Sequence, residues 1–163
     1  MKNIGILSVF IITMAFAGFA AAEDRSEVPH WSPGAQDAVA VVVHPLNPAR
    51  MLTTAQLREI FTRKVLGWHR VGGPHELSIR PIIGRVDSPS REAFRQRILS
   101  GREFQECEMM EGDDRILHAV AGDEAAIGVV SLSTALRRKG IRILAVDGEK
   151  ASLDNPKYPL SQP

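Results

Sequence analysis

Cysteine is nearly absent from this sequence, which contains one in 163 residues. A single cysteine cannot form a disulfide within one chain, so the monomer is not stabilised by one. Cys107 is therefore either a small hydrophobic residue of the core, which we favour, or a free thiol open to intermolecular pairing.

Motifs for catalysis and metal binding are missing as well. The five histidines (His30, His44, His69, His75 and His118) form no His-x-x-x-His pair on an expected helix, which argues against a metal site. The acids between Glu106 and Asp114 lack the glycine-centred spacing of a calcium loop, so we expect a solvated acidic loop. No Gly-x-Ser-x-Gly motif and no pattern of Ser/His/Asp or Cys/His catalysis occurs. We expect no enzyme, no cofactor and no bound metal.

The chain also lacks an excess of charge of either sign, with 20 basic and 19 acidic residues. Without Lys2 the two numbers are equal. Proteins that bind nucleic acid or membrane surfaces through bulk electrostatics carry a clear excess of positive charge. Neither kind of partner is expected here.

One long apolar run opens the chain. Residues 1–22 carry Lys2, an apolar stretch and an Ala-Ala-Ala end before the polar EDRSE, which is typical of a secretory signal peptide. A single-pass membrane anchor is the alternative, although the small residues and the abrupt polar switch favour cleavage. No cysteine follows the run, which argues against a lipid anchor. We expect an exported protein of the periplasm, with no membrane insertion after cleavage.

The rest of the chain divides into three parts. Residues 23–36 form a short flexible arm, 37–148 one domain, and 149–163 a polar, proline-rich tail that we expect to be loosely ordered. Within the domain, strand patterns alternate with helix patterns. The expected strands are 37–45, 77–86, 125–133 and 141–148. The expected helices are 53–64, 89–100, 113–123 and 134–140. Such alternation predicts an α/β fold with a mainly parallel central sheet flanked by helices.

Local signals refine these boundaries. Thr53 and Gln56 form a capping box at a helix start, and Asp113 is a candidate N-cap. Gly122 and Gly140 are candidate helix ends. Pro81 in the second strand implies an edge position or a bulge, because proline cannot donate a ladder hydrogen bond. The loop 67–76 is rich in turn residues.

The stretch RVDSPSREAF (85–94) lies where a strand gives way to a helix. Ser88 as N-cap and Pro89 at the first helical position make a favoured helix start. This cap does not explain the local basic excess, in which only Asp87 and Glu92 oppose six arginines, namely Arg80, Arg85, Arg91, Arg95, Arg97 and Arg102. Free amides, hydroxyls and guanidinium groups at a helix start are the parts of an oxyanion site. Arginines on a solvated helix face are the alternative.

Three blocks carry a family resemblance. In order, FTRKVLGWHRVGGP (61–74), IIGRVDSPSREAF (82–94) and DDRILHAVAGDEAAIGVVSL (113–132) resemble the phosphate-binding proteins of bacterial phosphate ABC transporters. The resemblance covers about residues 39–148. It implies a type II periplasmic-binding-protein fold and recognition of an oxyanion, with phosphate the favoured one, without catalysis. Trp68 matches the tryptophan of that family and is expected to pack under the turn rather than to stack on a ligand.

The resemblance also implies a set of binding residues. Arg85 would supply the guanidinium, Ser88 and Ser90 would supply hydroxyls, and the amides of Ser90 and Arg91 would add main-chain donors. Asp87 would accept the proton of hydrogen phosphate, which distinguishes it from sulfate; a turn or capping acid is the alternative for Asp87. Pro89 departs from the family, because it removes an amide that glycine would offer.

The family folds as two lobes, and the arm at 23–36 is too short to supply one of them. We therefore expect one lobe, with a second from a homodimer or a partner protein, and an ABC transporter permease as a further partner. The competing hypothesis is an envelope interaction module that keeps the fold of the lobe without ligand binding.

Overall fold

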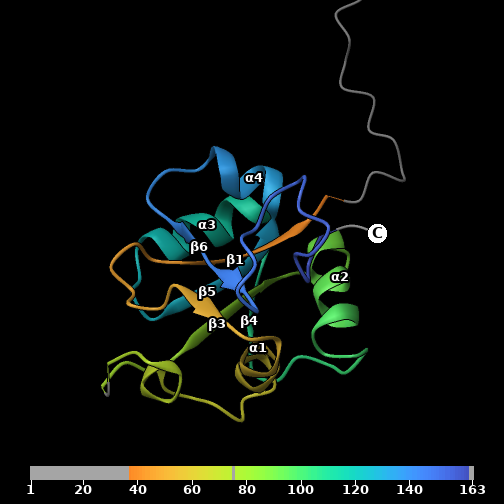
Figure 1. The fold of residues 1–163 in the computed structure, drawn as a ribbon. Helices are drawn as coiled ribbons and strands as arrows, with labels where there is room; N and C mark the ends of the chain where they lie inside the picture. The colour runs from red at the N-terminus through yellow and green to blue at the C-terminus, as the bar shows by residue number, and fades with distance from the viewer. Residues whose placement is uncertain (1–36, 75, 162–163) are drawn as a thin grey trace, which may run out of the picture. The chain divides into compact units, whose positions relative to one another are not determined.

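A five-stranded sheet organises the protein (Figure 1). The computed structural model describes residues 37–74 and 76–161. The strand order is β4-β3-β5-β1-β6, and the bounds are β1 Val39–Val43, β3 Arg80–Gly84, β4 Glu108–Met110, β5 Ala126–Ser131 and β6 Arg142–Ile143. Since β3 is parallel to β4 and β5, and β1 is antiparallel to both β5 and β6, only β1 opposes the common direction. The expected mainly parallel sheet is confirmed.

Helices cover both faces of this sheet (Figure 1). Their bounds are α1 Thr54–Phe61, α2 Pro89–Arg97, α3 Asp113–Ala121 and α4 Leu132–Arg137. Successive residues of β1 point to opposite faces, so Val41 packs in a core with α1 and α2, whereas Val42 packs in a core with α3 and α4. This two-sided burial explains why β1 is an uninterrupted apolar run rather than an alternating one.

Helix starts follow the local signals closely, with one shift. Thr53 and Gln56 form the expected capping box at α1, and Ser88 caps α2 with Pro89 in its first turn. Asp113, however, is the first residue of α3 and not its N-cap, which is Gly112. The Asp113 carboxylate instead accepts the amide of Ser131 at 2.7 Å, and so it ties the start of α3 to the end of β5.

The end of the domain differs from expectation in three places. Ser131 caps α4 two residues earlier than expected, and α4 ends at Arg137, before Gly140; Gly122 does cap α3 as expected. The expected strand 141–148 is split into β6 and a short β7, Ala145–Val146, which pairs in parallel with β2, Met51–Leu52. The amide of Leu144 still donates to Val41, whereas that of Ala145 donates to Arg50, so the chain changes partners there.

Pro81 occupies an interior strand in regular register with Ile127, so the prediction of an edge position or a bulge is wrong. The amide of the preceding residue, Arg80, donates to Ala125 on the β5 side. In a parallel strand successive residues bond to opposite neighbours, so the missing amide of Pro81 faces β4. The pairing with β4 starts only at Ile82, and therefore no ladder bond is lost.

The tail after residue 149 is part of the core, which corrects the expected loose order. Tyr158 is 1% exposed and Leu160 is fully buried. The amide of Val39 at the start of β1 donates to the Leu160 carbonyl at 3.0 Å, and Arg97 of α2 donates to the carbonyl of Ser161. Two apolar side chains outweigh the polar composition of the segment, because their burial stabilises it.

The expected signal peptide and arm lie outside the described residues. Within the part that is described, no helix is both long and apolar enough to cross a membrane.

Candidate functional site

The turn that joins β3 to α2 folds back over the end of its own strand. The amide of Ser88 donates to the Arg85 carbonyl at 3.0 Å, which closes the turn, and the Ser88 hydroxyl accepts the amide of Arg91 at 3.4 Å. Gly84 makes this approach possible, because a Cβ at that position would lie 2.5 Å from the hydroxyl of Ser88. The strand end is thus shaped to bring a helix N-terminus close to it.

An open cleft of about 1070 Å³ lies at the carboxyl ends of β3 and β4. It is lined by Arg85, Val86, Asp87, Met109, Met110, Glu111, Asp114, Arg115, His118 and Ala119. These residues come from the turn before α2, the end of β4 and one face of α3. Val86 is 74% exposed and Met109 is 60% exposed, so the cleft combines charged and apolar walls. Ligands of α/β sheets gather at such strand ends.

The six arginines between residues 80 and 102 divide into two groups according to their partners. Four have partners within the protein, and these are Arg80, Arg91, Arg95 and Arg97. For the side chains of Arg85 and Arg102, no hydrogen bond or ion pair is found among the described residues. Only Arg85 lines the cleft. Most of the local basic excess is therefore structural, and Arg85 is the guanidinium available to a ligand.

Ser90 and Arg91, adjacent in the first turn of α2, differ in how their donors are used. Ser90 is 8% exposed, and neither its amide nor its hydroxyl meets a partner within residues 37–74 and 76–161. The Arg91 amide serves the Ser88 cap, and its guanidinium lies 5.1 Å from the ring centroid of Phe104 and 3.6 Å from Glu103. Arg91 thus contacts Glu103 and Phe104 and does not line the cleft.

Asp87 and Ser88, the other two expected site residues, lie on the same turn. The carboxylate of Asp87 is exposed and lines the cleft, and no hydrogen bond to it is found among the described residues. Ser88 is half-buried and keeps its hydroxyl proton free to donate, because its oxygen acts as the acceptor in the cap. Of the expected site residues, Arg85 and Asp87 therefore line the cleft, whereas Ser88 and Ser90 follow on the same turn outside its lining.

Sequence reasoning missed the opposite wall of the cleft. Glu111 follows the β4 residue Met110, which pairs with Gly84, so its backbone continues alongside Arg85. Asp114, Arg115 and His118 face the cleft from α3. The spacing of these three residues, which places them on one face of the expected helix, could have indicated this wall from the sequence. The wall was missed because the acidic residues from 106 to 114 were interpreted as a solvated loop, whereas β4 lies within that segment.

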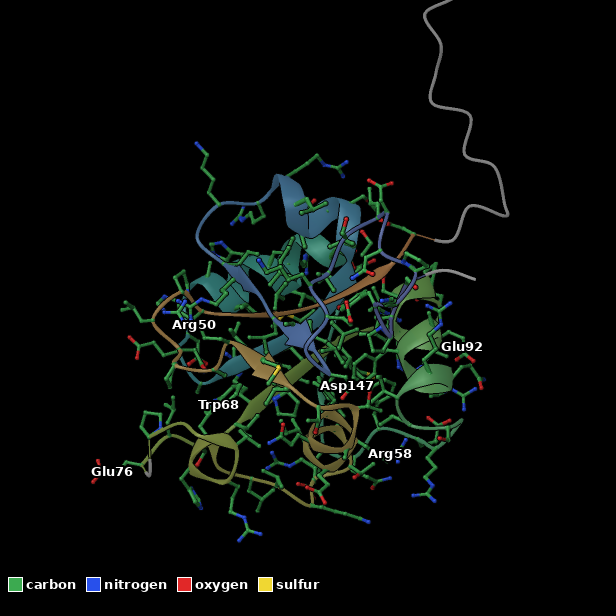
Figure 2. The ribbon with its side chains drawn as sticks, in the orientation of Figure 1. Arg50, Arg58, Trp68, Glu76, Glu92 and Asp147 are labelled. Atoms are coloured by element: carbon green, nitrogen blue, oxygen red, sulfur yellow. The ribbon has the colours of Figure 1, made fainter. Side chains whose placement is uncertain are left out.

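Other charged groups hold the fold rather than the cleft. The carboxylate of Asp147 accepts the amide of Thr54 at 2.8 Å and its hydroxyl at 2.6 Å, which fixes the start of α1 (Figure 2). On α2, hydrogen bonds from Arg95 and then from Gln96 lower the pKa of Glu92 to about 2. No group of His, Cys, Asp and Glu among the described residues could hold a metal ion.

Cys107 is partly buried against the core, and its thiol lies 3.4 Å from the carbonyl oxygen of Gln105. Burial raises its pKa to about 12. Because the thiolate is the reactive form, alkylation by iodoacetamide at pH 8 is expected to be at least about tenfold slower in the folded protein than in urea. Mass spectrometry of timed samples measures both rates. Equal rates would mean that the thiol is freely accessible, as intermolecular pairing requires.

The chain is similar in sequence and in fold to several known proteins. The chain is 31% identical over 121 residues to protein SphX of Synechococcus elongatus, which covers 70% of this chain. It is 28% identical to a protein of Clostridium perfringens assigned as a phosphate ABC transporter substrate-binding protein and solved with bound phosphate, with a TM-score of 0.65 over 73% of this chain. An ABC-type phosphate transport receptor of Vibrio cholerae shares the fold, with a TM-score of 0.70 at 22% identity over 76% of this chain.

These relatives are longer than the described domain. The chain spans 36% of SphX, 49% of the Clostridium protein and 53% of the Vibrio receptor. The structural relatives confirm the resemblance noted in the sequence and its fold class, a lobe of the type II periplasmic-binding-protein kind. The family profile described as the PBP superfamily domain matches residues 12–162, and the chain belongs to the PBP superfamily.

Proposed function

We propose that this protein is an exported, non-catalytic receptor that binds phosphate at the turn of residues 85–91 and acts in phosphate uptake or sensing. The observation that carries the proposal is the guanidinium of Arg85 at the edge of the cleft, on the turn that leads into α2, which has no partner in the described part of the chain. The likeness to the Clostridium protein solved with bound phosphate supports it. An ABC transporter permease is the partner that this function needs.

The chemistry of the turn suits a tetrahedral oxyanion. A helix N-terminus carries partial positive charge and free amides, and a guanidinium adds charge-assisted hydrogen bonds. Ser88 and Ser90 would donate hydroxyl protons, and the unused amide of Ser90 would add a main-chain donor. Pro89 contributes no amide. Asp87 would accept the proton of hydrogen phosphate, which sulfate lacks at neutral pH, and would thereby favour phosphate.

The affinity of this single lobe is expected to be modest. Arg85 and Asp87 are exposed, so water and salt screen their interaction with the anion. A dissociation constant between micromolar and millimolar, roughly −8 to −4 kcal/mol, is expected. A second lobe contributed by a partner protein or a second copy would strengthen binding by excluding water from the anion.

Calorimetric titration with phosphate tests the proposal. Arg85→Ala is expected to weaken binding at least about tenfold, because a charge-assisted contact is lost. Ser90→Ala is expected to weaken it less. Arg102→Ala is the matched control, since Arg102 is also exposed and without a side-chain partner among the described residues, and lies outside the cleft. Equal affinity of Arg85→Ala and the wild type would overturn the proposed site, and saturable binding of sulfate with equal strength would overturn its selectivity.

One observation favours a second candidate function, an envelope interaction module. Val86 and Met109 expose large apolar side chains in the same cleft. Apolar surface of this kind marks protein interaction sites when it is contiguous. A module of this kind would show no phosphate binding up to millimolar concentration, which the titration above measures directly.

A further inference from the structure

The charges around the cleft extend beyond the turn that would hold a simple anion. Two guanidinium groups, Arg85 and Arg115, face three carboxylates, Asp87, Glu111 and Asp114. The arginines and carboxylates of the lining sum to one negative charge. None of these five charged side chains has an ion pair or hydrogen bond within the described residues, so they remain available to a ligand. A phosphate dianion bound at Arg85 would leave only Arg115 to offset the three carboxylates, so two of them would be uncompensated.

The register of the sheet brings an arginine and a glutamate to neighbouring backbone positions at the end of the ladder. β3 and β4 pair with Gly84 opposite Met110, so Arg85 and Glu111 are the next positions on parallel neighbours. Adjacent strands lie about 5 Å apart. No ion pair between Arg85 and Glu111 is formed all the same, since the structure shows no contact between them within 4.0 Å among its described residues. A cationic group and an anionic group are thus both left for a ligand at this end of the cleft.

The size and the walls of the cleft also point to an organic ligand. The open cleft of about 1070 Å³ is larger than one phosphate ion needs. Val86, Met109 and Met110 supply apolar surface between the turn and α3. The carboxylates do not converge into a group that could hold a metal ion in the described part of the chain.

We infer that the cleft binds a zwitterionic organic phosphate, an aminoalkyl phosphate ester or phosphonate, rather than inorganic phosphate alone. The inference rests on the proposed anion site at Arg85. The phosphoryl group binds Arg85 and the start of α2, the short alkyl chain lies over Val86 and Met109, and the ammonium group binds the carboxylates of Glu111 and Asp114. Asp87 stays at the phosphoryl end, and Arg115 offsets one of the other two carboxylates, which leaves one for the ammonium group.

The inference is tested with three ligands, each of which differs from the next in one feature. The protein used is residues 23–163, the chain without the expected signal peptide. Isothermal titration uses inorganic phosphate, ethyl phosphate and 2-aminoethyl phosphate at the same ionic strength. The last two share a phosphoryl group and a two-carbon chain, and only one has an ammonium group. We expect 2-aminoethyl phosphate to bind about two- to fivefold more tightly than ethyl phosphate, the range that an exposed ion pair supports.

Variants separate the two ends of the ligand. Glu111→Gln combined with Asp114→Asn is expected to abolish the preference for the amine and to leave the affinity for ethyl phosphate equal or higher. Glu124→Gln, an exposed carboxylate outside the cleft, is the control and should keep the preference. Arg85→Ala is expected to weaken the binding of all three ligands.

The outcomes distinguish the inference from the function on which it rests. If inorganic phosphate and both esters bind through Arg85 but the amine adds nothing, the zwitterionic ligand is ruled out and the anion site stands. If the amine preference survives in the Glu111/Asp114 variant, the assigned carboxylates are wrong and the inference fails. If no ligand binds at all, the proposed function fails together with the inference.

Discussion

A chain that ends at Asn155 is expected to be largely unfolded at 25 °C under conditions in which the full chain is folded. The deletion removes Tyr158 and Leu160, which are 1% and 0% exposed and belong to the core cluster shared with α1 and α2. Loss of a buried leucine side chain costs about 2–5 kcal/mol, and loss of a buried aromatic costs about 3–5 kcal/mol. Their sum is comparable to the whole stability of a typical domain, about 5–15 kcal/mol.

Circular dichroism and urea denaturation of the truncated and full chains measure this effect. Lys157→Ala changes an exposed residue of the same segment and should shift stability by no more than about 0.5 kcal/mol. Tyr158→Phe is a sharper control, because the hydroxyl of Tyr158 is buried without a partner among the described residues. Removing an unsatisfied buried hydroxyl should be neutral or stabilising. A truncated chain as stable as the full one would show that the tail is dispensable.

The tail marks a limit of local sequence reasoning. Its composition is polar and rich in proline, which predicts loose order when the segment is considered alone. The burial of Tyr158 and Leu160 depends on a hydrophobic surface formed by distant parts of the chain. The backbone bond from Val39 to Leu160 joins positions at opposite ends of the domain. No periodicity within fifteen residues carries that information.

Features encoded within a few residues were predictable. The capping box of Thr53 and Gln56 and the Ser88–Pro89 helix start both occur as expected, because the hydrogen bonds that define them connect neighbouring residues. The run Val39–Val43 was predictable as a strand buried on both faces, since continuous β-branched residues suit that position. β4 was missed because a strand of three residues with exposed side chains owes its conformation to pairing with β3.

The candidate site was predictable in its turn but not in its cleft. Six arginines looked equivalent in the sequence, and only their partners separate them. Arg80 pairs with Glu108 at 2.6 Å and Arg95 pairs with Glu92 at 2.8 Å, whereas Arg85 faces the cleft. The carboxylate wall on the other side is assembled by packing of α3 against the sheet. A close approach at Gly128, where a Cβ would lie 2.8 Å from Ile116, fixes that packing.

Trp68→Ala is expected to destabilise the fold by about 3–5 kcal/mol without changing the affinity of the molecules that remain folded. Trp68 is fully buried in the 3₁₀ helix η1, Trp68–Val71 (Figure 2), and does not line the cleft. Its indole N–H donates to the carbonyl of Ala125 at 3.0 Å, next to β5. The substitution therefore removes a large apolar side chain and leaves a carbonyl without its donor.

Urea denaturation and phosphate titration of the same variants separate packing from ligand stacking. Trp68→Phe keeps most of the apolar volume and loses the hydrogen bond, so a smaller loss of about 1–3 kcal/mol is expected. Leu66→Ala, at a neighbouring residue that is 52% exposed, should change stability by no more than about 0.5 kcal/mol. A packing role requires that stability follow this order while phosphate affinity stays constant. Loss of affinity in a stably folded Trp68→Phe variant would instead show that the ring contacts the ligand, and the cleft would have to extend to η1.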